Sequence, residues 1–135
     1  MRISTRSYYG LRALVHLAKE RRICPTSKIA KEENLPYDYL QKIFQRLKKA
    51  GLIKSVKGVE GGYLLSRPAK RISAGQIFEI LEGRMASAPC LGFGQLSCSR
   101  ARGCSSRDLW QKLETTINQA LGSITLADLA ANKKV

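Results

Sequence analysis

Three cysteines in the second half of the chain are the residues best suited to metal or redox chemistry. Cys90, Cys98 and Cys104 follow the spacing Cys-x7-Cys-x5-Cys in a stretch rich in glycine and serine. Structural zinc sites usually contain a close Cys-x-x-Cys pair, whereas a loop of separated thiolates can wrap an iron–sulfur cluster. The residues leave three hypotheses open: an iron–sulfur cluster, a zinc site, or free redox-active thiols. The remaining cysteine, Cys24, and the single histidine, His16, are expected to be structural.

A second group of polar residues has the composition of a DNA-reading surface. A helix that begins at Pro36 is predicted to bury an apolar stripe and to turn amide and cationic side chains outward. Such side chains reach base edges in the major groove, and lysines beside them meet phosphates. We expect DNA contacts from Arg2, Ser4, Thr26, Ser27, Tyr37, Tyr39, Gln41, Lys42, Gln45, Arg46, Lys57, Gly61 and Gly62.

The distribution of charge supports a polyanionic partner for the N-terminal half. The chain has 135 residues and carries 24 Lys and Arg against 10 Asp and Glu, a net charge of +14. Residues 1–72 hold a net charge of +12, which leaves only +2 for residues 73–135. A balance of this sign suits a polyanion, which is nucleic acid or an anionic membrane surface. We therefore expect the N-terminal half to bind double-stranded DNA.

Length and hydropathy argue against several other classes of protein. A chain of 135 residues can form one modest core and an appendage. It has no apolar run near the ~18 residues of a membrane helix and no signal-peptide core, so we expect a cytoplasmic protein that does not enter a membrane. An enzyme is not expected, because there is no nucleotide-binding glycine loop and no base beside a nucleophile. The charge alone is compatible with RNA binding, but the sequence lacks an aromatic platform for single strands.

The elements that position these residues follow from apolar periodicity and capping residues. Three helices are predicted, over residues 4–20, 27–33 and 36–50. Two strands over residues 52–56 and 63–65, joined by a glycine-rich turn, predict a hairpin. The expected caps of the helices are Ser4 or Thr5, Thr26 and Gly51. The expected fold is mainly α with a small β-hairpin wing: a winged helix-turn-helix followed by a long C-terminal helix.

The second half of the chain predicts two further helices on either side of the cysteines. A capping box at Ser73–Gln76 opens a helix that Gly83 closes. Residues 84–104 show no periodicity and are predicted to form a structured loop. Ser105 opens a longer helix that Gly122 ends, and a last turn or two follows. The expected units are a winged helix-turn-helix over residues 1–83, a cysteine-bearing cluster loop over 84–104, and a dimerisation helix with a C-terminal turn over 105–131.

The long C-terminal helix is expected to pair two copies of the chain. The winged-helix unit has a core of its own, so the apolar stripe of this helix has little to bury against within one chain. Pairing would place two recognition helices one DNA turn apart, about 34 Å, on a palindromic operator. The expected interface residues are Leu109, Trp110, Leu113, Ile117 and Leu121.

Motifs along nearly the whole chain resemble those of the Rrf family of bacterial winged-helix transcription regulators, the IscR, NsrR and RirA type. The motifs are MRIST at 1–5, YLQKIFQRL at 39–47, GVEGGYLL at 58–65, ISAGQI at 72–77, the three cysteines with DLW at 108–110, and SITLADL at 123–129. The resemblance implies a dimeric regulator, most often a repressor, whose DNA affinity depends on an iron–sulfur cluster held by Cys90, Cys98 and Cys104. A [2Fe-2S] cluster is favoured and [4Fe-4S] is the alternative. The cysteine spacing is most similar to that of iron-responsive RirA-type members.

The fourth cluster ligand departs from the family pattern. The IscR type has a histidine where this chain has Arg107, and NsrR-like members use an acidic residue of the partner's first helix where this chain has Tyr8. An exogenous ligand or water is the first expectation for this position, Asp108 the second, and Tyr8 or Tyr9 the last. The alternative function within the same fold is a regulator that uses bare cysteine thiols or a protein partner in place of a cluster.

Overall fold

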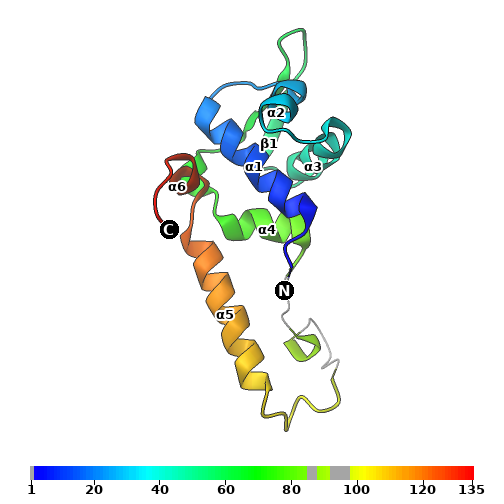
Figure 1. Ribbon diagram of the computed structural model, residues 1–135, viewed down its shortest axis with the longest axis vertical. Helices are drawn as coiled ribbons and strands as arrows, with labels where there is room; N and C mark the ends of the chain where they lie inside the picture. The colour runs from blue at the N-terminus through cyan, green and yellow to red at the C-terminus, as the bar shows by residue number, and fades with distance from the viewer. Residues whose placement is uncertain (1, 85–87, 92–97) are drawn as a thin grey trace.

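Helix α1 (Thr5–Glu20) is the central helix of the N-terminal unit and contacts α2, α3, α4 and α6 (Figure 1). The structure, a computed structural model, describes residues 2–84, 88–91 and 98–135. Ser4 caps α1 as predicted, because its hydroxyl accepts a hydrogen bond of 3.2 Å from the backbone N–H of Ser7. The helix ends at Arg21, whose φ of 54° is left-handed.

The helix-turn-helix is formed by α2 (Thr26–Glu32) and α3 (Tyr37–Lys49). The prediction that Thr26 caps the first of these helices is wrong. Pro25 holds the extended N-cap position, and Thr26 is already helical and only 8% exposed. The prediction for α3 is confirmed: its apolar stripe is fully buried, and Gly51 follows the helix with a φ of 83°. That stripe comprises Leu40, Ile43, Phe44 and Leu47.

The wing is an antiparallel hairpin of β1 (Ile53–Val56) and β2 (Gly62–Leu65), confirming the predicted pair of strands. Its base is tied to the chain segment between α1 and α2, where Cys24 and Tyr63 exchange backbone hydrogen bonds of 2.9 and 2.8 Å. A side chain at Gly62 would collide with the carbonyl group of Cys24. Gly62 therefore has a packing role, and Cys24 is fully buried as a structural residue.

A 3-10 turn, η1 (Ala69–Arg71), leads from the wing into α4 (Ala74–Glu82). The capping box predicted at Ser73 and Gln76 is present, and Gly83 ends the helix with a φ of 81°. α4 buries Ile77 and Leu81 in the same core as α1 and α3. This packing fixes α4 beneath the helix-turn-helix, directly before the cysteine-bearing part of the chain.

The C-terminal part contains η2 (Pro89–Leu91), α5 (Arg107–Ser123) and α6 (Leu126–Ala130). α5 begins two residues later than predicted and continues through Gly122, which is helical here. It extends away from the core (Figure 1), and α6 returns to α1 with Leu126 fully buried. Among the described residues, every helix is too short or too polar to cross a membrane.

Candidate DNA interface and cysteine segment

The outward face of α3 is exposed and polar, as a recognition helix requires. Asp38, Lys42 and Gln45 are exposed, and Gln41 is half-buried. Gln41 is held by its neighbour one turn earlier, because its Nε2 donates a hydrogen bond of 2.6 Å to the hydroxyl of Tyr37. An amide with one side fixed in this way presents its remaining polar atoms in a defined direction. Of the polar residues of α3, Gln41 therefore has the clearest geometry for reading a base edge.

The guanidinium groups of Arg6 and Arg46 meet at the end of α4. Arg6 Nε, from α1, donates a 2.6 Å hydrogen bond to the carbonyl oxygen of Leu81, and Arg46 Nη1, from α3, donates one of 3.3 Å to the same oxygen. Carbonyls in the last turn of a helix lack intrahelical partners, so cations near them are favourable. Arg46 was expected to contact DNA; it is exposed, and it also joins the recognition helix to α4.

Ser4 and Tyr39, two other expected DNA contacts, are engaged within the protein. The Ser4 backbone N–H donates to Glu82 Oε1 at 2.9 Å, and its hydroxyl donates to the same oxygen. These hydrogen bonds hold the pKa of Glu82 below its usual range. The ring of Tyr39 is half-buried and packs edge-on against that of Tyr9, with centroids 5.9 Å apart. Both contacts bind α1 to neighbouring elements.

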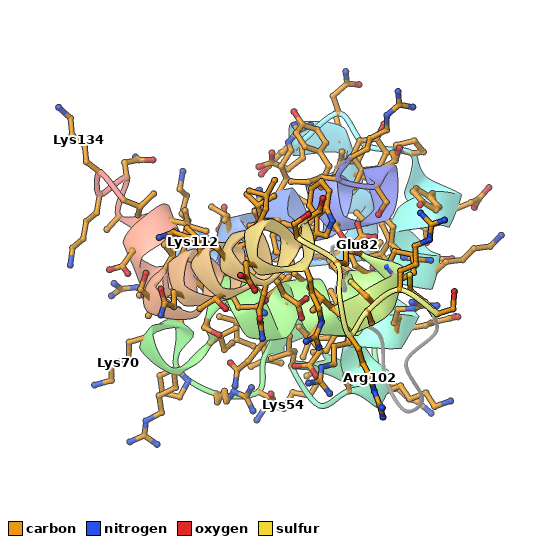
Figure 2. The ribbon with its side chains drawn as sticks, turned by 90° about the horizontal axis from the view of Figure 1, so that it is seen from below. Lys54, Lys70, Glu82, Arg102, Lys112 and Lys134 are labelled. Atoms are coloured by element: carbon orange, nitrogen blue, oxygen red, sulfur yellow. The ribbon has the colours of Figure 1, made fainter. Side chains whose placement is uncertain are left out.

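Cationic side chains of the wing and its surroundings reach into solvent. Lys57 is exposed beside the hairpin tip, and Val59 at the tip is completely exposed. Figure 2 shows Lys54 and Lys70 extending outward from the molecular outline. Arg2 and Ser27 are exposed as well, whereas Gly61 is half-buried. The wing therefore offers positive charge of the kind that contacts phosphates.

All three candidate ligand cysteines are free and half-buried. Cys90 lies in η2, and Cys98 and Cys104 flank the turns that precede α5. Within the described ranges, their sulfurs do not form a group of ligand atoms within 4.8 Å of one another. Residues 92–97, which join Cys90 to Cys98, lie outside the described part of the chain. The structure therefore supplies three available thiols and does not show them gathered around a common point.

The residues around the thiols fit an anionic group in their chemistry. Three thiolates are the donors that iron–sulfur clusters take. Arg107 follows Cys104 closely, and its backbone N–H donates to the Cys104 carbonyl at 3.2 Å. Its Nε is buried and has no hydrogen-bond partner among the described residues, a donor that a bound anion would satisfy. Asp108, the predicted alternative ligand, is exposed in the first turn of α5; Tyr8 is 58% exposed on α1.

The apolar stripe of α5 is left uncovered in the single chain. All 17 residues of α5 are described and none is buried. Leu109 is 55% exposed and Leu113 is 40% exposed, while the other members of the stripe are half-buried. These other members are Trp110, Ile117 and Leu121. An apolar row of this length on a protruding helix is typical of a surface that another helix covers.

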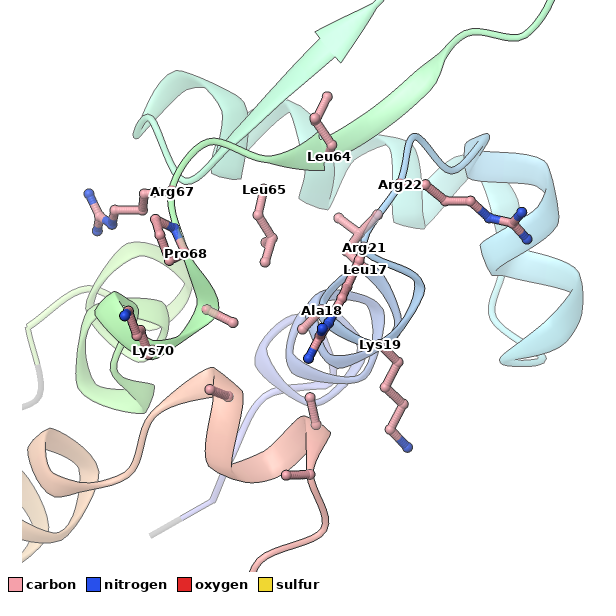
Figure 3. A pocket seen from close by; sticks show the side chains of 14 residues that line it. Leu17, Ala18, Lys19, Arg21, Arg22, Leu64, Leu65, Arg67, Pro68 and Lys70 are labelled. Atoms are coloured by element: carbon pink, nitrogen blue, oxygen red, sulfur yellow. The ribbon is translucent and has the colours of Figure 1, made fainter.

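A hollow of about 890 Å³ lies where α1, β2, η1 and α6 come together (Figure 3). The labelled Arg22, Arg67 and Lys19 reach away from its rim, and Leu65 points between the elements. Its walls come from segments far apart in the chain, so it could not be predicted from local sequence patterns. Its basic rim adds to the positive charge of the N-terminal unit.

The arrangement of helix-turn-helix, wing and protruding helix has counterparts among known proteins. Residues 3–132 match the Rrf2 family, described as iron-dependent transcriptional regulators. The chain belongs to the Rrf2 family. The HTH-type transcriptional regulator CymR of Bacillus subtilis is 36% identical over 133 residues, covering 97% of this chain and 91% of that protein.

Two solved structures of Rrf2-family relatives have the same fold. CymR of B. subtilis superposes with a TM-score of 0.82 at 33% identity, covering 99% of each chain. IscR of T. potens superposes with a TM-score of 0.78 at 33% identity, covering 98% of this chain and 88% of that one. The predicted winged-helix fold and family are confirmed. This Rrf2-family chain is a DNA-binding transcription regulator, and its family consists of regulators rather than enzymes.

Proposed function

We propose that this Rrf2-family regulator represses transcription as a homodimer on a palindromic operator, and that an iron–sulfur cluster held by Cys90, Cys98 and Cys104 controls its DNA affinity. One observation carries the link between the cysteine segment and DNA affinity: the carbonyl oxygen of Leu81 accepts hydrogen bonds from Arg6 of α1 and Arg46 of α3. The recognition helix is thereby joined to the end of α4, and the cysteine-bearing segment starts directly after α4.

In this proposal, α3 and the wing contact the DNA. Tyr37 orients Gln41 toward a base edge, and Gln45, one turn later, reads the next position on the same face. Lys42 and Lys57 contact phosphates, as do the exposed Arg2 and Ser27. The proposed contacts that also serve the protein's own packing are Ser4, Thr26, Tyr39, Arg46, Gly61 and Gly62.

In this proposal, α5 forms the dimer interface. A second copy of the same helix would cover the exposed Leu109 and Leu113 and complete the burial of the half-buried stripe. Two-fold pairing of this kind is the commonest arrangement of soluble oligomers and matches a palindromic site. We assign residues 1–83 to DNA binding, 84–104 to the cluster loop, and 105–131 to dimerisation, with α6 packed back on α1.

Cys90, Cys98 and Cys104 would hold the cluster, [2Fe-2S] in preference to [4Fe-4S]. When bound, it would supply a centre whose stability depends on iron and oxidants. Arg107 would donate its unpartnered Nε toward the negative charge of the thiolates. The fourth ligand is exogenous or water, with Asp108 and then Tyr8 or Tyr9 as alternatives.

Coupling between the two regions runs through the end of α4. Gly83 and Arg84 connect Leu81 and Glu82 to the cysteine segment, and Ser4 holds Glu82 from the start of α1. If the cysteine segment were held more or less tightly, these residues would shift. Through Arg46, the recognition helix would then shift with them. Such a shift in each protomer alters the spacing of two recognition helices on a palindrome.

Anaerobic reconstitution of the full chain with iron and sulfide tests the cluster. We expect an iron-dependent visible absorbance that is lost in Cys90→Ala, Cys98→Ala and Cys104→Ala. Cys24→Ala is the matched control and should keep the absorbance, because Cys24 is buried in the core of the winged-helix unit. Wild-type protein without such absorbance would overturn the cluster proposal.

A thiol switch is the second candidate function. The three cysteines are free and half-buried, which favours a role as reactive thiols. CymR of B. subtilis, a structural relative, is described as the global cysteine regulator of its organism. On this alternative, oxidation of the thiols changes DNA affinity in protein that contains no iron.

A further inference from the structure

We propose a second metal site in this protein, independent of the cysteines, in which His16 and Glu20 of α1 and Glu32 of α2 bind a divalent transition-metal ion such as Zn²⁺. His16 Nε2 and one carboxylate oxygen from each glutamate lie within 4.8 Å of one another. Among the described residues, this is the one group of three His, Cys, Asp or Glu side chains whose ligand atoms lie this close together. The sequence suggested a structural role for His16, and the carboxylates around it were not foreseen.

The second observation is that His16 is buried with one ring nitrogen unpartnered. The residue is 8% exposed. Its Nδ1 lies 2.9 Å from Glu33 Oε1, a hydrogen bond. Glu32 Oε2 lies 3.1 Å from Nε2, yet the contact lacks hydrogen-bond geometry, so Nε2 has no hydrogen-bond partner among the described residues. A buried imidazole nitrogen without a hydrogen bond is costly, and a cation between it and the facing carboxylates would satisfy it.

Glu33 is placed to orient His16 for a metal ion. A hydrogen bond from Nδ1–H to a carboxylate leaves the lone pair on Nε2, the arrangement found behind most metal-bound histidines. The Nε2 lone pair then faces Glu32 Oε2 and, at 3.8 Å, Glu20 Oε1. Two ligands on a tetrahedral Zn²⁺ are about 3.3 Å apart, since each lies about 2.0–2.1 Å from the metal. The distance from Nε2 to Glu32 Oε2 is slightly shorter than this ligand–ligand distance, and the distance from Nε2 to Glu20 Oε1 is slightly longer.

The cationic side chains near the site pair with the oxygens of Glu20 and Glu32 that point away from His16. Lys28 Nζ lies 3.8 Å from Glu20 Oε2 and 3.9 Å from Glu32 Oε1, and Arg22 Nε lies 3.0 Å from Glu20 Oε2. The other oxygen of each carboxylate is the one that faces His16. Arg12 pairs with Glu33 at 3.3 Å and supports the carboxylate that holds Nδ1. Imidazole and carboxylate ligands suit Zn²⁺ and similar ions, and water would complete the coordination.

Such an ion would join α1 to α2, the first helix of the helix-turn-helix. The alternative occupant of the site is a proton, which would make His16 an imidazolium paired with three carboxylates. The two occupants can be separated because His16 is the single histidine of the chain. Its ring nitrogens therefore give unambiguous NMR signals, which zinc bound at the cysteines would not imitate.

The test is a Zn²⁺ titration of the 135-residue chain, followed by the ¹⁵N resonances of His16. We expect a saturable change at Nε2, with an affinity that falls at least about 10-fold in Glu32→Gln and in Glu20→Gln. Glu60→Gln, in the wing, is the matched control and should leave the affinity unchanged. Resonances that respond to pH but not to Zn²⁺ would overturn the proposal and show an ion-pair cluster only.

A second test looks for a gain of Zn²⁺ affinity in a variant that keeps all three proposed ligands. Lys28→Gln removes a half-buried cation that competes for both carboxylates, so it should raise Zn²⁺ affinity at His16. Lys31→Gln, an exposed change on the same helix, should not. Equal affinity in these two variants would contradict the proposed ligands.

Discussion

Arg46 of the recognition helix donates a hydrogen bond of 3.3 Å to the carbonyl oxygen of Leu81, in the last turn of α4. The same oxygen accepts from Arg6 of α1 at 2.6 Å. Three helices of the DNA-binding unit are thus joined at one atom of Leu81, three residues before the cysteine-bearing segment begins at residue 84. This junction gives the proposed sensor a short route to the proposed DNA-reading surface.

The junction predicts that Arg46 is needed for coupling. Arg46→Gln should reduce the difference in operator affinity between cluster-loaded and cluster-free protein, by about 0.5–2 kcal/mol of coupling free energy. Fluorescence anisotropy with a labelled operator duplex measures this difference. Lys49→Gln removes a cation from the same helix and should weaken both forms alike. An unchanged difference in Arg46→Gln would rule out this route.

Gln41 should determine base preference. Gln41→Ala is expected to cost roughly 1–3 kcal/mol of binding free energy on the preferred operator and to relax preference at one position in each half-site. Lys57→Ala should instead weaken binding to all sequences and lower the salt slope by about one. Competition binding with a panel of operator variants measures both effects. A Gln41→Ala protein with the wild-type preference would exclude base reading by this residue.

The exposed stripe of α5 should hold the dimer together. Ile117→Asp would place a carboxylate in an apolar interface and should give monomers or insoluble protein, because a buried unpaired charge is costly. Gln119→Asp introduces the same charge at an exposed position of the same helix and should leave the dimer intact. Sedimentation at micromolar concentration distinguishes them. Wild-type protein that sediments as a monomer would refute pairing through α5.

Glu82 should make stability depend on pH. Its pKa is lowered, chiefly by the hydrogen bond from the Ser4 hydroxyl, so the folded protein takes up this proton less readily than the unfolded chain. The resulting stabilisation is present above the ordinary carboxyl pKa and is lost as pH falls through the folded value. Glu82→Gln should therefore lower the free energy of unfolding at neutral pH, by about 1 kcal/mol, and have little effect in acid.

Urea unfolding at neutral and at acid pH measures this dependence. Glu79→Gln, an exposed change on the same helix, is the control and should have little effect at either pH. A Glu82→Gln variant as stable as the wild type at neutral pH would contradict the role of the hydrogen bonds from Ser4.

Local features of the fold could be predicted from the sequence because they depend on near neighbours. The buried stripe of α3 and the capping box of α4 are set by residues three or four positions apart. Thr26 was misplaced because Pro25 and Thr26 can each stand at the start of a helix, and burial of the Thr26 side chain decides between them. Gly122 resembles a C-cap, yet α5 continues past it to Ser123.

Long-range features of the candidate sites could not be predicted in this way. The meeting of Arg46 with Leu81 joins residues 35 positions apart and depends on the packing of α3 against α4. The spacing of His16 and Glu20, one helical turn, was visible in the sequence. The approach of Glu32 and Glu33 to the same imidazole required the fold of α2 onto α1.

The most direct test of the central claim is the operator affinity of the protein before and after removal of a reconstituted cluster, measured anaerobically on one duplex at one salt concentration. The proposed function predicts an affinity change of at least about 10-fold, equivalent to about 1.4 kcal/mol. Cys98→Ala should bind the operator with the affinity of the cluster-free protein under both conditions. Identical affinities of the loaded and cluster-free wild-type protein would contradict control of DNA binding by a cluster.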